Sequence, residues 1–264
     1  MSLVAIVVPT SSQPVCSPDE EIALRHVDHF LGKYDRYFVS PKGASLTRPG
    51  FAVESFPTRY FGSTRAHARL MFSEEFYERF RRYKYILMHH LDSLVLSDQL
   101  VRWCEADLDL IGPPWLHSAD SPWVDRPRVG NGGFTLLKVE GHLKVLRSTR
   151  PAVDPDEYWR SLSAATPPSR RWLHLPRKYV KRLSAFNNVR WETRRWRGNG
   201  DLFWADEAVK FYPDFRIASV EQGLEFAFEA APRMCFELNN RRLPFGCHAW
   251  ARYDRAFWEP YLLQ

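Results

Sequence analysis

Several features that would define a protein class are missing from this sequence. The cysteines Cys16, Cys104, Cys235 and Cys247 are widely separated and form no CxxC pair, which argues against a zinc knuckle or a disulfide framework and favours a reducing compartment. No apolar run approaches the length of a membrane span. The first apolar run is too short for a signal peptide and is typical of a first strand. We therefore expect a soluble, cytoplasmic protein.

Net positive charge is also lacking outside one segment. The formal net charge is +6 over 264 residues. Residues 169–197 contain ten Lys or Arg against one acid, Glu192, so this segment carries +9 and leaves −3 for the remainder. The length favours one large domain, 1–264, with a basic insertion at 151–197.

The basic insertion has an amphipathic pattern. Leu175, Tyr179, Leu183 and Phe186 recur at helical spacing. The opposite face carries Arg177, Lys178, Lys181 and Arg182, with Trp172, Trp191 and Trp196 nearby. Such a helix suits an anionic membrane surface, so 169–197 would hold the protein at the inner face of the membrane. The pattern would serve RNA almost as well, and a solvated arm packed on the domain is the third reading.

The first 60 residues alternate strands and helices. Leu3–Val8, Tyr37–Val39 and Val53–Phe56 are apolar runs typical of buried strands. A helix is predicted from Pro18, capped by Ser17. Strand, helix, strand is the order of a parallel sheet with right-handed crossovers, so we expect an α/β fold.

A helix with a break near Ser73 is predicted over 63–83. Arg65 and Arg69 lie four residues apart near its start. They form either a diphosphate-binding pair or a solvated basic face.

Residues 83–96 are the most informative stretch. The apolar run Tyr85–Met88 ends in His89, His90, Leu91 and Asp92, and this pattern suits a strand buried on both faces of a parallel sheet. Its polar end would lie at the carboxyl edge, where open α/β sheets bind ligands. Asp92 is therefore a candidate ligand-binding residue. The alternative is that Asp92 caps a helix starting near Asp98.

A glycine-rich turn follows a Pro-Pro-Trp segment and the loop 116–128, which we expect to cover the cleft. Residues 130–134, Gly-Asn-Gly-Gly-Phe, permit a close approach of backbone to a ligand, although a plain tight turn is the alternative. The turn is neither a P-loop, because no GK[ST] follows, nor a Rossmann fingerprint, because its spacing differs and a strand, 134–139, follows.

Three residues in the last third carry further chemistry. Asp206 and Glu207 either satisfy the dipole of a helix start or supply a general base. His248 lies between a glycine turn and a Trp, where a structural role is the alternative to a ligand.

Together these motifs resemble a family of poorly characterised GT-A-type glycosyltransferase domains. The motifs are His90-Leu91-Asp92, Ile111-Gly112-Pro113-Pro114-Trp115, Gly130-Asn131-Gly132-Gly133-Phe134, Asp206-Glu207 and Pro244-Phe245-Gly246-Cys247-His248-Ala249-Trp250. The resemblance is strong over 80–140 and 200–250. It implies a single Rossmann-like α/β/α sandwich with a mostly parallel sheet. The implied reaction moves a sugar from a nucleotide-diphosphate donor to a hydroxyl of a glycan or lipid-linked acceptor, in surface polysaccharide synthesis.

The resemblance also implies a role for each matched residue. Asp92 and His248 would hold Mn²⁺ or Mg²⁺, although His90 stands where the family's Asp-x-Asp motif has its first Asp. Asp206 or Glu207 would deprotonate the acceptor in an inverting displacement. The implied donor-binding residues are Pro9, Thr10, Arg65, Arg69, His90, Leu91, Asp92, Gly132 and Gly133, and the acceptor-binding residues are Trp115, Asn131 and Phe134.

Two other functions are considered. A nucleotidyltransferase on the same sheet would need a Gly-rich, Lys- or Arg-bearing loop after the first strand, where this chain has Thr10-Ser11-Ser12-Gln13-Pro14. A basic RNA-binding module would spread its basic and aromatic residues over the surface, whereas here the net positive charge is confined to one segment and no RRM or KH motif occurs. Nucleic acid is therefore the less favoured partner.

Overall fold

The fold is known from a computed structural model, which describes residues 2–130 and 132–263. Its centre is a six-stranded sheet with the strand order β3-β2-β1-β4-β9-β6. The strands are β1 (Ser2–Pro9), β2 (Asp35–Pro41), β3 (Phe51–Phe56), β4 (Tyr83–His89), β6 (Leu110–Ile111) and β9 (Phe134–Lys138). The pairs β1–β2, β2–β3 and β1–β4 are parallel, whereas β9 runs antiparallel to both β4 and β6. The sheet is therefore mixed but mostly parallel.

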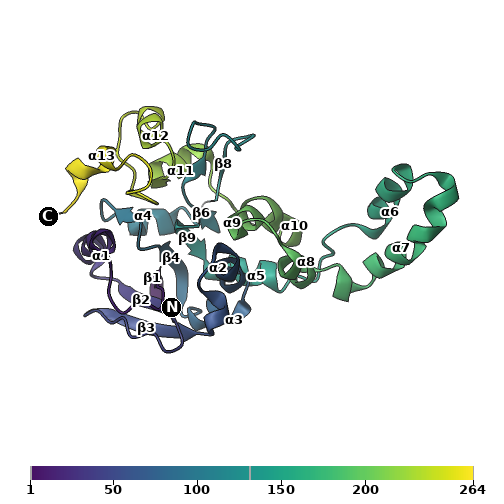
Figure 1. Cartoon of the computed structure of the whole chain (residues 1–264), viewed down its shortest axis with the longest axis horizontal. Coiled ribbons are helices and arrows are strands. Elements are labelled where there is room, and N and C mark those ends of the chain that lie inside the picture. The colour runs from purple at the N-terminus through teal and green to yellow at the C-terminus, as the bar shows by residue number, and fades with distance from the viewer. Residues whose placement is uncertain (1, 131, 264) are drawn as a thin grey trace.

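The central residues of strands β1 and β4, 4–8 and 85–88, are apolar because helices cover both faces of the sheet (Figure 1). In β4, Tyr85 and Leu87 belong to one core cluster, while Ile86 and Met88 belong to the other. Alternate side chains of a strand point to opposite faces, so a strand with two buried faces has no polar positions to spare. The expectation of an α/β sandwich with a mostly parallel central sheet is confirmed.

Helices α1 (Pro18–Leu31), α4 (Leu100–Glu105) and α11 (Val220–Phe226) supply one core cluster. Helix α1 starts as predicted, since Ser17 accepts from the N–H of Glu20, Glu20 bonds back to the N–H of Ser17, and Pro18 takes the first helical position.

The other cluster comes from α2 (Thr64–Met71), α3 (Glu74–Arg79), α5 (Val139–Leu146), α8 (Val189–Arg195), the π-helical turn Phe203–Glu207 and α10 (Ala208–Phe211). The predicted break near Ser73 separates α2 from α3.

A third core cluster lies under the C-terminal part of the chain. Strands β5 (Leu94–Val95), β10 (Ala227–Phe228) and β11 (Gly246–Cys247) form a small sheet in the order β10-β11-β5. Helices α12 (Pro232–Leu238) and α13 (Arg255–Trp258) and the turn Glu259–Tyr261 pack around it. The two-stranded pair β7 (Pro114–Trp115) and β8 (Arg128–Val129) brackets the loop 116–127. The small sheet carries the C-terminal segment to the edge at which β4 ends.

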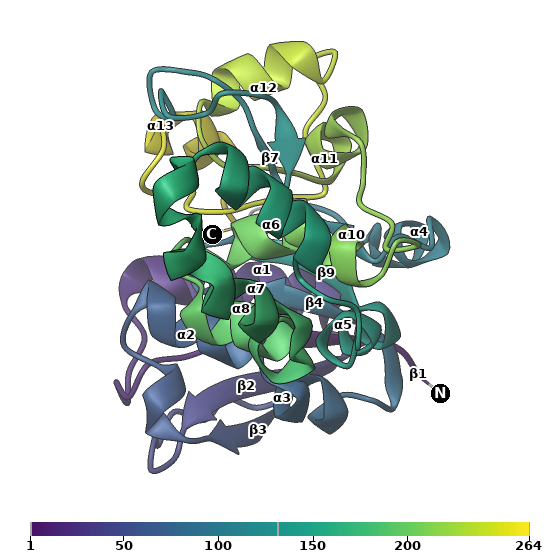
Figure 2. The ribbon, with the colours of Figure 1, turned by 90° about the vertical axis from the view of Figure 1, so that its right-hand side faces the viewer.

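Residues 151–187, called the arm below, project from the body (Figure 1). The arm consists of α6 (Pro155–Ala164), the 3₁₀ turn Pro168–His174, α7 (Leu175–Arg182) and the 3₁₀ turn Ser184–Phe186. Figure 2 views the molecule with the arm toward the reader. The Asn187 side-chain amide donates to the carbonyls of Val153 and Lys181, which closes the base of the arm. Helix α8 then returns the chain to the body.

No helix within residues 2–130 and 132–263 is long and apolar enough to cross a lipid bilayer. The shorter elements complete the inventory: the 3₁₀ turn Thr58–Tyr60 precedes α2, and α9 (Gly200–Leu202) precedes the π-helical turn.

Candidate metal-binding active site

A cleft of about 650 Å³ opens at the carboxyl end of the parallel strands. Pro9 and Thr10, at the end of β1, line one wall, and His90, Leu91 and Asp92, just after β4, line the next. The strand order turns around between β1 and β4, because β2 lies on one side of β1 and β4 on the other. This switch point is where open α/β sheets bind their ligands. The cleft therefore lies at the edge that the sequence indicated for Asp92.

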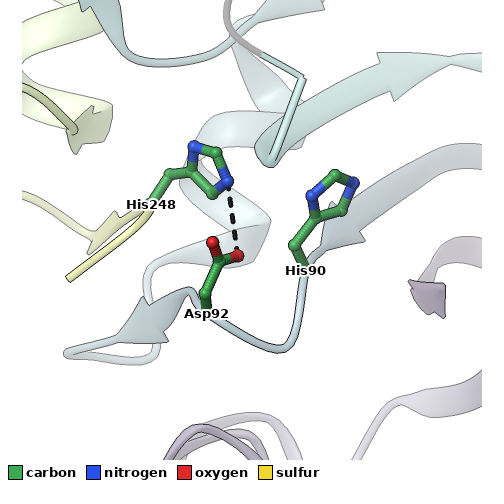
Figure 3. A group of neighbouring side chains, drawn as sticks. All are labelled: His90, Asp92 and His248. Carbon is green, nitrogen blue, oxygen red and sulfur yellow. Dashed lines mark ion pairs between the residues drawn. The ribbon is translucent and has the colours of Figure 1, made fainter. Parts of the chain in front are cut away.

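Three side chains in the cleft form a potential metal site (Figure 3). One ligand atom each from His90, Asp92 and His248 lies within 4.8 Å of the others. The Nε2 atom of His248 is 3.3 Å from Oδ1 of Asp92. The buried Nε2 atom of His90 has no hydrogen-bond partner in the described part of the chain. A buried nitrogen with a free lone pair beside a carboxylate and a second imidazole is a suitable set of ligands for a divalent cation.

Glu229 fixes the orientation of the His248 ring. Its Oε1 lies 2.9 Å from Nδ1 of His248, and such a carboxylate holds the second imidazole nitrogen toward a cation. Burial lowers the pKa of His248, but hydrogen bonds and charge from Asp92 and Glu229 outweigh burial and raise the pKa to about 10. The imidazole is thus bracketed by two carboxylates that come from different parts of the chain.

The contact with His248 also lowers the pKa of Asp92. Burial raises its pKa, but the hydrogen bond and positive charge of His248 outweigh this and hold the pKa at about 2. The alternative reading of Asp92 as a helix cap does not hold, because α4 begins at Leu100 and its N-cap residue is Gln99. Asp92 thus remains an ionised carboxylate in the cleft.

The glycine turn brings the backbone close to the functional side chains. A Cβ atom on Gly133 would lie 2.0 Å from the His248 ring, and one on Gly132 would lie 2.2 Å from Oδ1 of Asp201. Both glycines line the cleft. The sequence predicted a close approach of this backbone to a ligand, and within the protein that approach is made by His248 and Asp201. Asn131, also predicted to bind the acceptor, lies outside the described residues.

Several cleft residues were not singled out from the sequence, among them two titratable side chains, Asp201 and His67. Asp201, in α9, lies against Gly132, and its pKa is raised to about 6 because burial outweighs the hydrogen bond from the Gly132 N–H. His67, in α2, stacks edge-on to His90 with ring centroids 5.0 Å apart, and burial and the charge of His248 lower its pKa to about 4. The local signal in the sequence is the Gly198-Asn199-Gly200 turn that directly precedes Asp201.

Asp206 and Glu207 do not line the cleft. Asp206 lies 3.3 Å from a guanidinium nitrogen of Arg126 and 3.6 Å from one of Arg128. Glu207 pairs with Lys210 at 2.6 Å. Their catalytic role stays a prediction, and the geometry favours Asp201 for that position.

The remaining acceptor predictions have little support in the geometry. Phe134 is 0% exposed and packs against Phe226 and Phe245 in the core. Trp115 is 5% exposed and lies beneath Trp123. Because neither ring presents a face to the cleft, neither can stack on a sugar in this conformation. The loop 116–128 likewise contributes no residue to the cleft lining.

The two helix arginines also lie elsewhere. Arg65 is exposed and lines no part of the cleft, and Arg69 lines a neighbouring cavity on the other side of Tyr60. Serine and threonine at the start of α2, Ser63 and Thr64, reach the cleft in their place.

Comparison with known proteins shows the family of the chain. A family model described as "Protein of unknown function (DUF5672)" matches residues 50–248, about three quarters of the sequence. The chain therefore belongs to this family. No curated protein sequence matches it.

Two solved structures are similar to this one. A glycosyltransferase involved in the glycosylation of the major capsid of PBCV-1 has 11% identity and a TM-score of 0.46, with 98% of each chain covered. The glycosyltransferase GlyE of Streptococcus pneumoniae TIGR4 has the same identity and TM-score, with 99% of this chain and 60% of the other covered. Likeness at this level does not transfer an activity.

The contact between Gly133 and His248 leads to a first prediction. In the variant Gly133→Ala, the new methyl group displaces the His248 ring from Asp92, and we expect the affinity for Mn²⁺ to fall by a factor of about 10 or more. The overpacked site should also lower the free energy of unfolding by about 1–3 kcal/mol. Isothermal titration with Mn²⁺ and chemical denaturation measure the two effects.

Gly198→Ala is the matched control, because its methyl group would meet only Trp196, at 3.3 Å. Unchanged Mn²⁺ affinity in Gly133→Ala would show that the His248 ring is not needed at its present position.

Proposed function

We propose that this member of the DUF5672 family is a metal-assisted glycosyltransferase. It would transfer a sugar from a nucleoside-diphosphate donor to a hydroxyl of a glycan or lipid-linked acceptor, in the synthesis of a surface polysaccharide. The observation that carries the proposal is the cluster His90, Asp92 and His248 at the switch point of a mostly parallel sheet. Pro9 and Thr10, across the cleft from the cluster, would border the donor nucleotide.

The charge of the cleft explains why a cation is needed. Its lining includes the carboxylates of Glu20, Asp92, Asp201 and Glu229, but Arg252 is the one Lys or Arg among the described lining residues. A diphosphate could not be held by these side chains alone, since like charges repel strongly in a partly buried site. His90, Asp92 and His248 would hold a divalent cation, which would supply positive charge to offset that of the leaving diphosphate.

The ligand set discriminates between the two expected metals. Mg²⁺ prefers oxygen ligands and retains its waters, whereas imidazole nitrogens suit transition metals. Two imidazoles and one carboxylate therefore favour Mn²⁺ over Mg²⁺. Glu229 supports the cluster from behind, through the Nδ1 atom of His248.

Asp201 is the best-supported general base. It is half-buried beside Gly132, lines the cleft, and has a pKa of about 6, near the value that suits proton abstraction at neutral pH. A base that activates the acceptor for direct attack on the anomeric carbon implies inversion of configuration. Asp206 and Glu207 are the alternative bases, and they would need to leave their ion pairs to act.

The surface of the arm supports binding of the protein to an anionic membrane. Seven large apolar side chains between Trp172 and Phe186 are exposed, among them Trp172 at 66% and Tyr179 at 62%. They lie among Arg170, Arg171 and the basic residues of α7. Exposed leucine and valine beside Lys and Arg fit the interface of an anionic bilayer better than they fit RNA, which is bound through stacking and charge.

The first test of the function is donor and metal binding. In a thermal-shift screen of UDP-, GDP-, dTDP- and CMP-sugars, we expect one nucleotide class to raise the melting temperature, with a larger rise in Mn²⁺ than in Mg²⁺. Asp92→Ala should weaken Mn²⁺ binding by a factor of at least about 10, because it removes a direct ligand. Calorimetry on the same variant measures that loss.

Asp98→Ala, a change of an exposed carboxylate that pairs with Lys33 outside the cleft, is the control. The proposal fails if no nucleotide sugar binds the wild type in the presence of either metal.

The second test concerns the base. Once the donor is known, Asp201→Asn should lower kcat by about 10²–10⁴-fold, the usual contribution of a general base. In the wild type, kcat should rise with pH through about 6, because the carboxylate is the active form, and level off above that value. The pH–rate profile of Asp201→Asn should lack this rise.

Asp206→Asn and Glu207→Gln separate the alternatives. A loss of kcat confined to one of these variants, with Asp201→Asn active, would assign the base to that residue instead.

The third test concerns the arm. The triple variant Trp172→Ala, Tyr179→Ala, Leu183→Ala should lose more than about tenfold in partitioning onto phosphatidylglycerol vesicles in a flotation assay, because each side chain contributes buried apolar area. Neutral phosphatidylcholine vesicles should bind the wild type much less.

A matched triple variant on the body, Trp123→Ala, Tyr261→Ala, Leu238→Ala, removes the same three types of exposed side chain. Equal flotation of both triple variants would rule out the arm as the membrane contact, and steep salt-dependent binding to RNA in place of vesicles would favour the nucleic-acid reading.

A further inference from the structure

A second cavity of about 490 Å³ lies beside the cleft and has the opposite charge. Four arginines line it, and Glu74 is its one acidic residue among the described lining. The arginines come from three segments: Arg59 from the 3₁₀ turn Thr58–Tyr60, Arg69 from α2, and Arg190 and Arg194 from α8. Tyr60 lines both this cavity and the cleft. The two cavities are therefore neighbours with a shared wall.

Most of this positive charge is not neutralised. The two carboxylate oxygens of Glu74 are occupied by Arg190, at 2.8 Å, and by Arg147, at 3.0 Å. Burial raises the pKa of Glu74, but the hydrogen bonds from these two arginines outweigh burial and lower it. Within residues 2–130 and 132–263, no acidic oxygen lies within 4.0 Å of the Arg69 or Arg194 guanidinium, in contrast to most arginines of the body. These two side chains are available for an anion.

The cavity also has an apolar floor beneath its arginines. Leu146 and Val189 are buried in the core, and Phe72 packs against the same cluster. The four arginines are themselves exposed, so the apolar residues exclude water from only one side of a bound anion. The planar guanidinium matches a phosphate with two parallel hydrogen bonds, which makes convergent arginines typical of phosphate recognition.

We propose that this cavity, called the arginine cavity, binds a phosphate group carried by the acceptor. The inference rests on the proposed function, in which the donor diphosphate occupies the cleft with the cation. The arginine cavity lacks metal-ligating carboxylates other than Glu74, which is already paired. It therefore suits the second phosphate-bearing substrate rather than the donor.

The packing of α2 joins this cavity to the proposed base. Arg69 projects from α2 into the arginine cavity, and the preceding residue, Ala68, packs against Gly200 so tightly that a Cβ there would lie 2.9 Å from the Ala68 Cβ. Gly200 precedes Asp201 in α9. A phosphate fixed on Arg69 would thus be held at a constant position relative to the carboxylate of Asp201, which is what orientation of an acceptor hydroxyl requires.

The arm adds a reason to place a phosphate here. Helix α8, which supplies Arg190 and Arg194, begins directly after the arm. If the arm lies on an anionic bilayer, the arginine cavity at its root is close to the headgroup level, where a lipid-linked phosphate is presented. A soluble sugar phosphate would use the same chemistry without the bilayer.

The test measures phosphate binding with the cation removed. In EDTA, calorimetric titration of the wild type with pyrophosphate and with glucose 1-phosphate should show saturable binding, whereas glucose should show none. The double variant Arg69→Gln, Arg194→Gln should weaken both by at least about tenfold. A short-chain polyprenyl phosphate in neutral detergent micelles then separates the two sources: tighter binding than glucose 1-phosphate indicates a lipid-borne acceptor, and equal or weaker binding a soluble one.

The control is Arg195→Gln, Arg197→Gln, which removes the same charge from two exposed arginines of the same segment that do not line the cavity. Equal loss in both double variants would reduce the effect to diffuse charge and overturn the site. Absence of saturable phosphate binding in the wild type would also overturn it. Nucleotide-sugar binding in Mn²⁺ is measured in parallel, so that its failure in the wild type counts against the glycosyltransferase proposal and not against the cavity.

A loss of nucleotide-sugar affinity in Arg69→Gln, Arg194→Gln, as large as the loss of phosphate affinity, would assign these arginines to the donor. That result would contradict the acceptor site and restore the role that the sequence predicted for Arg69.

Discussion

The placement of the His248 imidazole between Asp92 and Glu229 is the contact on which the site depends. Asp92 follows β4, Glu229 follows β10, and His248 follows β11. The three residues are far apart in sequence, and the small sheet β10-β11-β5 brings them together at the end of the large one. The ring also requires bare backbone at Gly133, because any side chain there would occupy its position. A single imidazole thus ties the C-terminal segment, the glycine turn and the central strand into one site.

Acidic side chains gather in the cleft and basic ones outside it, and cation binding explains this separation. A cleft that binds a cation needs carboxylates, and carboxylates repel a diphosphate unless the cation is present. Arginines inside such a cleft would pair with its acids and block it, as Arg126 and Arg128 do with Asp206 nearby. Apart from Arg252, the arginines nearest the cleft lie in the arginine cavity, and the arm carries a further group of basic side chains. The high net charge therefore describes the surroundings of the cleft and not the cleft itself.

The sequence was informative where local pattern and topology determine position. Short apolar runs predicted β1, β2 and β4, and Ser17 followed by Pro18 marked the start of α1. The carboxyl-edge rule placed Asp92 at the binding edge because it depends only on strand direction, and Pro9 was added by the family resemblance. Burial was harder to predict: Phe134 follows the glycine turn, but the alternation of β9 points its ring into the core.

Asp201 was not predicted, because its proximity to Gly132 comes from the tertiary packing of α9, and sequence periodicity gives no information on such packing. Arg69 was predicted to face the donor, yet the helical turn between Arg65 and Arg69 carries it to the far side of Tyr60.

Two weak contacts in series can supply acceptor selectivity that neither supplies alone. An interfacial arm binds any anionic surface, and a cavity of arginines binds many phosphates, so each is permissive in isolation. When both engage one lipid-borne acceptor, the second contact becomes intramolecular, and its effective concentration depends on how rigidly the two are joined. Here the join is short, since α8 leaves the arm and enters the cavity wall without an intervening linker. Discrimination between acceptors would then depend on how the connection between the arm and α8 positions the two contacts. Lengthening that join would reduce selectivity while leaving the metal site in the cleft unchanged.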